Sequence, residues 1–357
     1  MLIAAFCFLL ASASLLYLRQ PQFASPVVVD RTYIAPYHSG VFHNTVPAPI
    51  LANSDGLLTA WIKFLTNKIP EATPDFALPS EKTDLHALDK ESNVMVWMGH
   101  SSYFIQLDGV RFLVDPVFSD NASPVPYTNL AFEGSNIYQA EDIPEVDYLL
   151  ITHDHWDHLD HPSVVAVREK VAQAITPIGV GSYLTQWGYD ESKVFEGDWY
   201  DSFEQGQLQI HILPAQHFSG RLLKRNQTLW GSFALIMPKH KVYIGGDSGY
   251  GDHFRQIHAR LGAFDVAILE AGQYNENWRH IHMMPEETVQ ATLDLQAKAM
   301  IPAHNSKFKL SKHAWHEPLE RISELSHDAN FRLMTPMIGQ VMWLDDEQQN
   351  FERWWQQ

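Results

Sequence analysis

The sequence contains a single cysteine, Cys7, which lies near the start of the 357-residue chain. Intramolecular disulfides, cysteine-ligated zinc sites, CxxC redox centres and a catalytic cysteine in the folded body are therefore excluded. Positive charge is also scarce, because 25 Lys and Arg residues stand against 42 Asp and Glu residues, which gives a net charge of −17. A surface this acidic repels phosphate backbones, so no nucleic-acid partner is expected.

Long apolar runs are confined to residues 1–18, where no charge occurs before Arg19. The run of about 17 residues is at the lower edge of the length that spans a bilayer core. A cleaved signal peptide, with Ala11-Ser12-Ala13 as its cleavage site, and an uncleaved anchor both fit this pattern better than a buried core helix. We therefore predict that residues 1–20 are a signal peptide or membrane anchor, and that the chain is membrane-associated or exported.

The remaining chain divides into two parts by its hydrophobic pattern. Residues 21–90 are rich in Pro, Asn and Ser and predict an irregular segment that packs on the main domain, with one helical piece at 57–65. Residues 91–357 predict strands at Val94–Met98, Tyr103–Leu107, Val110–Val114, Tyr148–Thr152, Leu208–Leu213, Ser232–Met237, Val242–Gly246 and Val266–Leu269. Helices are predicted at Pro162–Gln173, Phe254–Leu261, Pro285–Ala297 and Trp315–Leu325. Strands followed by helices, twice over, indicate an α/β sandwich with helices outside two packed sheets.

The 19 histidines of the chain include a dense group directly after one predicted strand. His153, His155, Asp157 and His158 follow the apolar run that ends at Thr152. A loop that leaves a strand can point alternate side chains the same way, so the first two histidines can reach one cation. The next two residues can then reach a second cation nearby. Four nitrogen and oxygen donors in six residues would be costly to pack together without such compensation.

Single histidines and carboxylates follow three further apolar runs. His217 follows Leu208–Leu213, Asp247 follows Val242–Gly246, and His304 follows the strand-like run 300–303. Each of them alone fits a buried histidine or a turn aspartate as well as a ligand. Taken together and in this order, with two glycines before Asp247, they favour a metal site with two divalent cations.

These motifs resemble the metallo-β-lactamase superfamily. Shorter segments are similar to its N-acylphosphatidylethanolamine-hydrolysing phospholipase D branch: Met98-Gly99-His100-Ser101-Ser102-Tyr103, Leu113-Val114-Asp115-Pro116, Pro214-Ala215-Gln216-His217, Leu229-Trp230-Gly231-Ser232-Phe233, Gly246-Asp247-Ser248-Gly249-Tyr250 and residues 282–289. The similarity covers roughly residues 22–344. It implies an αββα four-layer sandwich that holds two metal ions, most often zinc, at one edge of the sheets.

The resemblance also implies a role for each candidate residue. One cation would be held by His153, His155 and His217, the other by Asp157, His158 and His304, with Asp247 as a bridge. Asp115 would orient the ligand loop, although a turn aspartate before proline fits equally well, and His282 would face the substrate. The family often has Trp-Gly after the last histidine ligand, whereas this chain has Asn305-Ser306 in the wall of the site.

This constellation predicts hydrolysis without a protein nucleophile. Two divalent cations, zinc by preference, would hold a bridging hydroxide oriented by Asp157, while Asp247 bridges the cations and His282 or a bound water protonates the leaving group. The resemblance points to a phosphodiesterase that acts on N-acylphosphatidylethanolamine-type phospholipids. A soluble hydrolase of small lactones or phosphorylated sugar lactones is the alternative. Expected partners are a phospholipid or another small anionic ester, a membrane surface and, by resemblance, a second copy in a homodimer.

Two further features leave alternatives open. Arg221, Lys224 and Arg225 could meet a lipid phosphate or form a solvated charge cluster. Trp354 and Trp355 could be interfacial aromatics or could pack back on the domain, which we favour.

Overall fold

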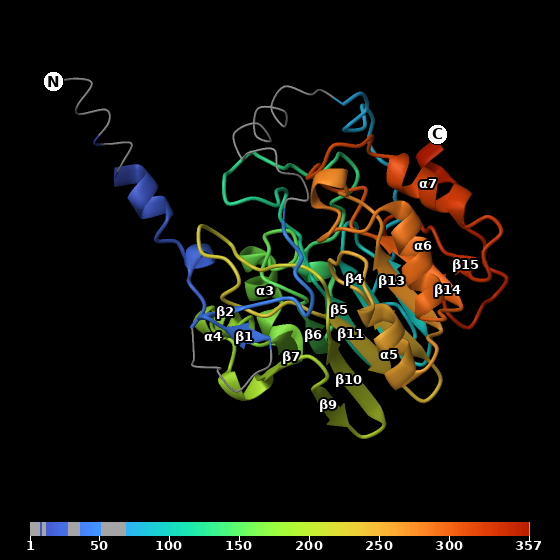
Figure 1. The fold of residues 1–357 in the computed structure, drawn as a ribbon, viewed down its shortest axis with the longest axis horizontal. Helices are drawn as coiled ribbons and strands as arrows, with labels where there is room; N and C mark the ends of the chain where they lie inside the picture. Colours follow the sequence, from blue (N-terminus) through green and yellow to red (C-terminus); the bar gives the residue numbers. More distant parts are fainter. Residues whose placement is uncertain (1–7, 9–11, 28–35, 51–68, 357) are drawn as a thin grey trace.

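Two mixed sheets lie face to face at the centre of the chain (Figure 1). The computed structural model describes residue 8 and residues 12–27, 36–50 and 69–356. The first sheet has the strand order β16 (Val341–Trp343), β3 (Val94–Trp97), β4 (Tyr103–Leu107), β5 (Val110–Val114), β6 (Val146–Leu150), β7 (Val171–Pro177), β8 (Val194–Gly197). The second has the order β15 (Arg332–Leu333), β14 (Ala299–Ala303), β13 (Val266–Glu270), β12 (Lys241–Ile244), β11 (Ser232–Ile236), β10 (Leu208–Leu213), β9 (Ser202–Gln205). A short hairpin, β1 (Tyr37–His38) and β2 (Val41–Phe42), precedes them.

Alternation along the strands builds the core between the sheets. In β4, Tyr103, Ile105 and Leu107 face the second sheet, whereas Phe104 faces the outer layer. In β14, Ile301 faces the first sheet, whereas Met300 faces the helices that cover the outside of the second sheet. Both faces of these strands are buried, which explains why they appear in the sequence as continuous apolar runs.

Helices cover both outer faces of the sandwich. The first sheet carries α3 (His161–Val167) and α4 (Gly181–Gln186), and the second carries α5 (His253–Leu261), α6 (Pro285–Asp294) and α7 (Glu317–Leu325). Helix α6 begins at the predicted Pro285, and Glu287 accepts a hydrogen bond of 2.9 Å from the amide of Met284 before it. The predicted αββα sandwich is therefore confirmed.

One predicted helix is too long. The helix expected at Pro162–Gln173 ends at Val167, and after one 3-10 turn the chain enters β7 at Val171. Strand β7 lies parallel between β6 and β8, so pairing on both sides outweighs the local helical pattern. The helical piece predicted at 57–65 lies outside the described residues, and the division of the chain at residues 20 and 90 stays a prediction.

The prediction of a membrane-associated or exported chain is wrong. Among the described residues, no helix combines the length and the apolar character needed to cross a membrane. The segment after residues 1–18 packs on the domain: Phe23 is buried against Trp156 at 5.4 Å between ring centroids.

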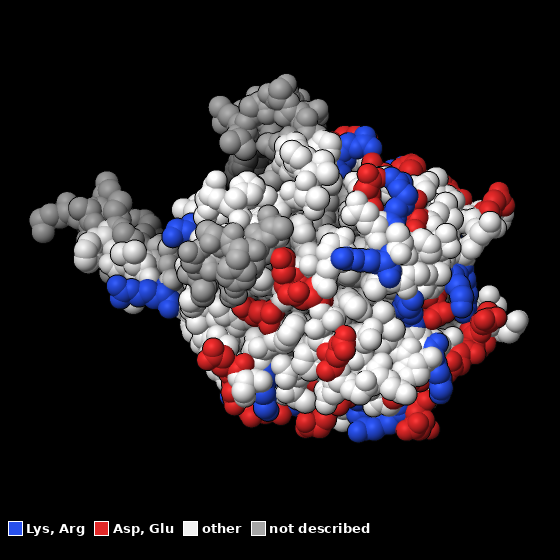
Figure 2. All heavy atoms as spheres, turned by 60° about the horizontal axis from the view of Figure 1, so that its bottom comes forward, with Lys and Arg blue, Asp and Glu red and all other residues white. Residues whose placement is uncertain are grey.

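Two further features are the packing of the C-terminal tryptophans and the distribution of charge on the surface. Trp354 and Trp355 are buried, and Trp354 packs against Trp97 and Trp315, so the C-terminal aromatics belong to the core. Figure 2 shows acidic and basic side chains interspersed on one face of the molecule, with white surface between them.

Candidate metal centre

The loop after β6 presents the histidine motif to the space between the two sheets. His153 is buried and points inward, as does His155, whereas Asp154 between them points away. The carboxylate of Asp154 accepts hydrogen bonds from the amide of Gly220 at 2.7 Å and from the hydroxyl of Tyr183 at 3.1 Å. The predicted alternation of side chains is therefore present, and the outward carboxylate ties the loop to its surroundings.

The first group of donors joins this loop to the end of β10. Nδ1 of His155 lies 2.9 Å from Nε2 of His153 and 3.2 Å from Nε2 of His217. The nearer carboxylate oxygen of Asp247, Oδ2, is 3.8 Å from Nε2 of both His153 and His217. These four residues can each place one ligand atom within 4.8 Å of all the others.

The second group joins the same loop to the end of β14. Oδ2 of Asp157 lies 3.6 Å from Nε2 of His158 and 3.3 Å from Nε2 of His304. The other oxygen of Asp247, Oδ1, lies 3.2 Å from Nε2 of His158 and 3.1 Å from Nδ1 of His304. Each oxygen of Asp247 thus faces a different group, which is the arrangement that a bridging carboxylate requires.

A buried carboxylate beneath the loop orients two of the histidines. Asp115 accepts hydrogen bonds from the amide of Thr152 at 2.8 Å, from its hydroxyl at 2.7 Å and from Nδ1 of His158 at 2.8 Å. Because the single hydroxyl proton of Thr152 goes to Asp115, its oxygen is left to accept from Nδ1 of His153, 3.0 Å away. In their neutral forms both rings then carry their lone pair on Nε2, toward the donor groups.

His217, which follows β10, is oriented in the same way. Nδ1 of His217 donates to the carbonyl of Ile281 at 2.9 Å, so its lone pair is also on Nε2. Nε2 of His158, Nδ1 of His304 and Oδ1 of Asp247 are buried without a hydrogen-bond partner. Converging lone pairs and unpaired buried atoms are what divalent cations satisfy, so the residues present fit the metal ions that the motifs imply.

The pKa shifts of the histidines also indicate a site that binds cations. Burial lowers the pKa of His153, His217 and His304 well below the usual range, which keeps the rings neutral and able to bind metal. Burial also lowers the pKa of His158, but Asp247 and the other nearby carboxylates outweigh it and raise that pKa well above the usual range. The carboxylates of the site therefore attract positive charge.

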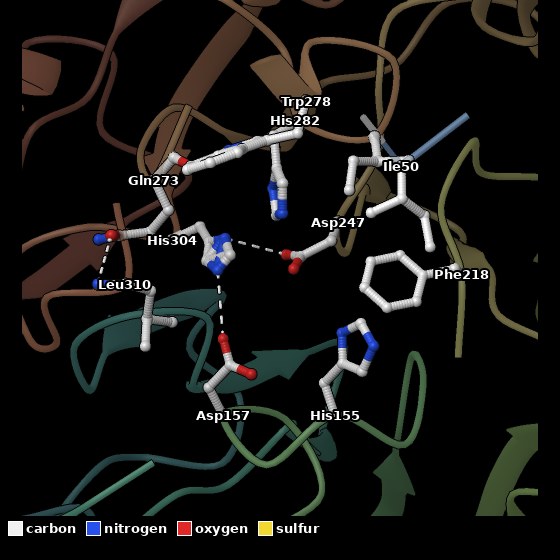
Figure 3. Close-up of a pocket in the computed structure, with 11 residues that line it drawn as sticks. Ile50, His155, Asp157, Phe218, Asp247, Gln273, Trp278, His282, His304 and Leu310 are labelled. Atoms are coloured by element: carbon white, nitrogen blue, oxygen red, sulfur yellow. Dashed lines mark hydrogen bonds and ion pairs between the residues drawn. The ribbon is translucent and has the colours of Figure 1, made fainter. Parts of the chain in front are cut away.

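A cavity of about 340 Å³ opens over the two groups (Figure 3). Its polar floor includes Asp157, Asp247 and His304, and its walls are largely apolar, formed by Ile50, Phe218, Trp278, Ile281 and Leu310. Figure 3 shows the ring of His282 pointing toward the floor, between His304 and Asp247. The predicted substrate-facing histidine thus lines the same cavity as the predicted ligands.

Two residues of the site had no predicted role. His100 is fully buried, and its Nε2 lies 2.8 Å from Oδ2 of Asp157. Glu270 ends β13 and accepts from Nδ1 of His282 at 2.7 Å and from the amide of Ser248 at 2.8 Å. A carboxylate at the end of an apolar strand is the same pattern that singled out Asp247, so Glu270 could have been found from the sequence.

Two sequence interpretations are corrected by the contacts. The amide of Asn305 donates to the carbonyls of Pro302 and Ala303, so this side chain turns back on β14 and does not line the cavity. Arg221 is not part of a solvated charge cluster. Its guanidinium is buried 3.9 Å from the ring centroid of Trp156 and donates to backbone carbonyls of the histidine loop.

Comparison with known proteins identifies the class. Residues 110–305 match the β-lactamase superfamily domain, and this range includes all seven predicted metal ligands: His153, His155, Asp157, His158, His217, Asp247 and His304. The chain belongs to this superfamily and is a metal-dependent hydrolase of the metallo-β-lactamase fold. A solved metallo-hydrolase of Ignicoccus hospitalis has the same fold, with a TM-score of 0.52 and 20% identity over 70% of this chain and 97% of its own.

Two of the relatives carry the name of the phospholipase D branch. The chain is 29% identical to N-acyl-phosphatidylethanolamine-hydrolyzing phospholipase D 1 of Caenorhabditis elegans, over 85% of this chain and 92% of the relative. It is 32% identical to the mitochondrial protein of the same description in Saccharomyces cerevisiae, over 70% of this chain and 55% of that protein. An uncharacterized protein of Mycobacterium tuberculosis is 37% identical over 85% of this chain and 83% of its own length. The resemblance to the phospholipase D branch is thereby confirmed.

Proposed function

We propose that this chain is a dinuclear, zinc-dependent phosphodiesterase that hydrolyses N-acylphosphatidylethanolamine-type phospholipids. The observation that carries the proposal is Asp247, whose two oxygens face two separate groups of buried histidines at the floor of one cavity. We expect zinc because imidazole nitrogens and carboxylate oxygens, the donors of this site, are common zinc ligands.

The residues around the proposed cation sites have different roles in the reaction. When bound, two divalent cations supply Lewis acidity toward a phosphoryl oxygen and activate water for attack. Asp157 lines the cavity and accepts a hydrogen bond from the attacking water, which orients it. His282 donates from Nε2 to the departing oxygen, while Glu270 holds the opposite ring nitrogen at 2.7 Å.

The apolar walls favour a lipid over a sugar substrate. Phe218, Trp278 and Leu310 offer hydrocarbon surface within reach of the polar floor, which suits an acyl chain attached close to a phosphodiester. The names of the Caenorhabditis and Saccharomyces relatives point to the same substrate class.

The test is direct hydrolysis by the purified full-length chain loaded with zinc. N-acylphosphatidylethanolamine in mixed micelles should yield phosphatidic acid and N-acylethanolamine, which mass spectrometry can follow. The Asp247→Ala variant should lose turnover by more than the roughly 10–100-fold that loss of a supporting residue costs, together with at least one bound metal. Asp345→Asn, at an exposed aspartate paired with Asn93 and His240, is the matched control and should keep full activity.

The outcomes separate the parts of the proposal. Two zinc ions per chain without product release would reject the lipid substrate and favour the lactone alternative. Full metal content in Asp247→Ala would reject the bridging role, whatever the substrate.

A further inference from the structure

His100 joins the two sheets at the edge where the donor groups meet. It lies in the loop between β3 and β4 of the first sheet, and its backbone pairs with the end of β14 in the second sheet. The amide of His100 donates to the carbonyl of Asn305 at 3.2 Å, and the amide of His304 donates to the carbonyl of His100 at 2.9 Å. Both histidines have a positive φ, 54° for His100 and 64° for His304. The loop is therefore held against the last predicted ligand by two backbone hydrogen bonds.

The side chain of His100 reaches the other end of the same donor group. Its Nε2 lies 2.8 Å from Oδ2 of Asp157, and its ring packs edge-on against the ring of His304 at 4.2 Å between centroids. A carboxylate can only accept, so Nε2 carries the proton and Nδ1 is left as an acceptor. This Nδ1 is buried without a partner. An unpaired buried nitrogen lowers the free energy of unfolding, so the contact of His100 with Asp157 has a cost in the stability of the fold.

Asp157 needs such a contact to keep one orientation. Its carboxylate lies 3.6 Å from Nε2 of His158 and makes a longer contact of 3.3 Å with Nε2 of His304. Among the described ring nitrogens near this carboxylate, Nε2 of His100 is the nearest, at 2.8 Å. Removal of this donor would leave Asp157 only the longer contacts, so its carboxylate could rotate more easily toward the open cavity that it lines.

We propose that His100 is a positioning residue that holds the carboxylate of Asp157 through Nε2 and so preorganises the second cation site. It acts on the cation through Asp157 and is not itself a ligand. This inference rests on the proposed pair of cation sites.

Two substitutions distinguish this role from a structural one. Gln can place its amide NH₂ close to the position of Nε2, but it fits the positive φ of this position poorly. Asn tolerates a positive φ better than most residues but is too short to reach Asp157. A positioning role predicts that His100→Gln is the better metal binder, whereas a backbone role predicts that His100→Asn is.

The experiment is a titration of the chelator-stripped full-length chain with Co²⁺ and with Zn²⁺. Absorption of bound Co²⁺ reports each site, and thermal unfolding reports the fold of each variant. We expect His100→Gln to bind the second ion within a few-fold of the unmodified chain. We expect His100→Asn to bind it roughly 10–100-fold more weakly, with the first ion unaffected.

Each other outcome overturns the inference. Equal loss of the second ion in both variants would make His100 a ligand, because an amide cannot replace an imidazole lone pair. Stronger binding by His100→Asn than by His100→Gln would make its role structural. If the unmodified chain binds only one ion, the proposed dinuclear site fails first, and that result is seen before any variant is compared.

Discussion

At the scale of single residues, the site depends on carboxylates whose two oxygens have different partners. Asp115 accepts from the backbone of Thr152 with one oxygen and from Nδ1 of His158 with the other. Asp247 divides its oxygens between two groups of histidines, and Glu270 divides its oxygens between His282 and the amide of Ser248. Each of these carboxylates fixes the orientation of a histidine ring relative to another part of the chain, so we expect its replacement to disturb the site.

Lys307 is a buried amine close to this site, and it predicts a dependence of stability on pH. Its Nζ donates to the carbonyl of Val117 at 2.7 Å, and burial lowers its pKa to about 7, although Asp160 and Asp120 act in the opposite direction. Between about pH 7 and 10 the unfolded chain therefore holds a proton that the folded chain lacks. The free energy of unfolding should rise with pH across this window, by at most about 1.4 kcal/mol per pH unit from this group.

Urea unfolding at several pH values, compared with Lys307→Met, measures this contribution. The variant leaves a buried carbonyl unpaired, so it should be less stable at high pH by about 1–3 kcal/mol or more. The difference between the two proteins should shrink as the pH falls to 7. Parallel curves for the two proteins would show that Lys307 keeps its proton when folded.

At the scale of elements, the donors lie where strands end. The histidine loop follows β6, and His217, Asp247 and His304 follow β10, β12 and β14. The strands are held by ladders on both sides, so the first residues after them are placed with little freedom. Glycine permits a close approach before Asp247: Gly246, with φ of 59°, lies where an added Cβ would be 3.0 Å from the carbonyl oxygen of Gly231 and from Cβ of Thr152.

We predict that Gly246→Ala destabilises the chain and moves Asp247. The left-handed backbone costs a side chain about 1–2 kcal/mol, and the close contact with two neighbours costs about 1–3 kcal/mol. Gly206→Ala is the matched control, because Gly206 has a similar φ of 62° but no atom within 4 Å of an added Cβ. Urea unfolding should show a loss at least about 1 kcal/mol larger for Gly246→Ala, accompanied by weaker binding of Zn²⁺. Equal losses would mean that the backbone conformation alone requires glycine.

At the scale of the whole molecule, the donor groups lie between the two sheets. Each group takes residues from the loop after β6 of the first sheet and from strand ends of the second sheet. Bound cations would therefore join the two halves of the sandwich as well as supply chemistry.

Removal of metal should lower thermal stability by a predictable amount. A cation at 100 times its dissociation constant stabilises the folded state by about 2.7 kcal/mol per site. Treatment with a chelator should therefore lower the unfolding midpoint by several degrees, and added Zn²⁺ should restore it. Asp247→Asn should lose most of this response, whereas Asp345→Asn should keep it. A midpoint that does not change with the chelator would contradict a cation link between the sheets.

Local pattern predicted most of the second-sheet strands and the start of α6, because alternation and helix capping depend on neighbouring residues. It failed at residues 168–173, where the end of α3 and the start of β7 depend on pairing with β6 and β8. The apolar composition of residues 1–18 also led to the prediction of a membrane-associated or exported chain, which is wrong. For the site, local pattern indicated which residues follow strands but assigned no role to His100 or Glu270.

The sequence by itself determined the chemical class, because a cluster of histidines and carboxylates after apolar strands has few uses other than binding metal. Only the tertiary structure decided which atoms meet. The contacts of Asp247 with His158 and His304, and the contact of His100 with Asp157, join residues more than 50 positions apart, and the apolar cavity walls also come from distant segments. Such contacts are set by how two sheets pack, and no local pattern of residues specifies that packing.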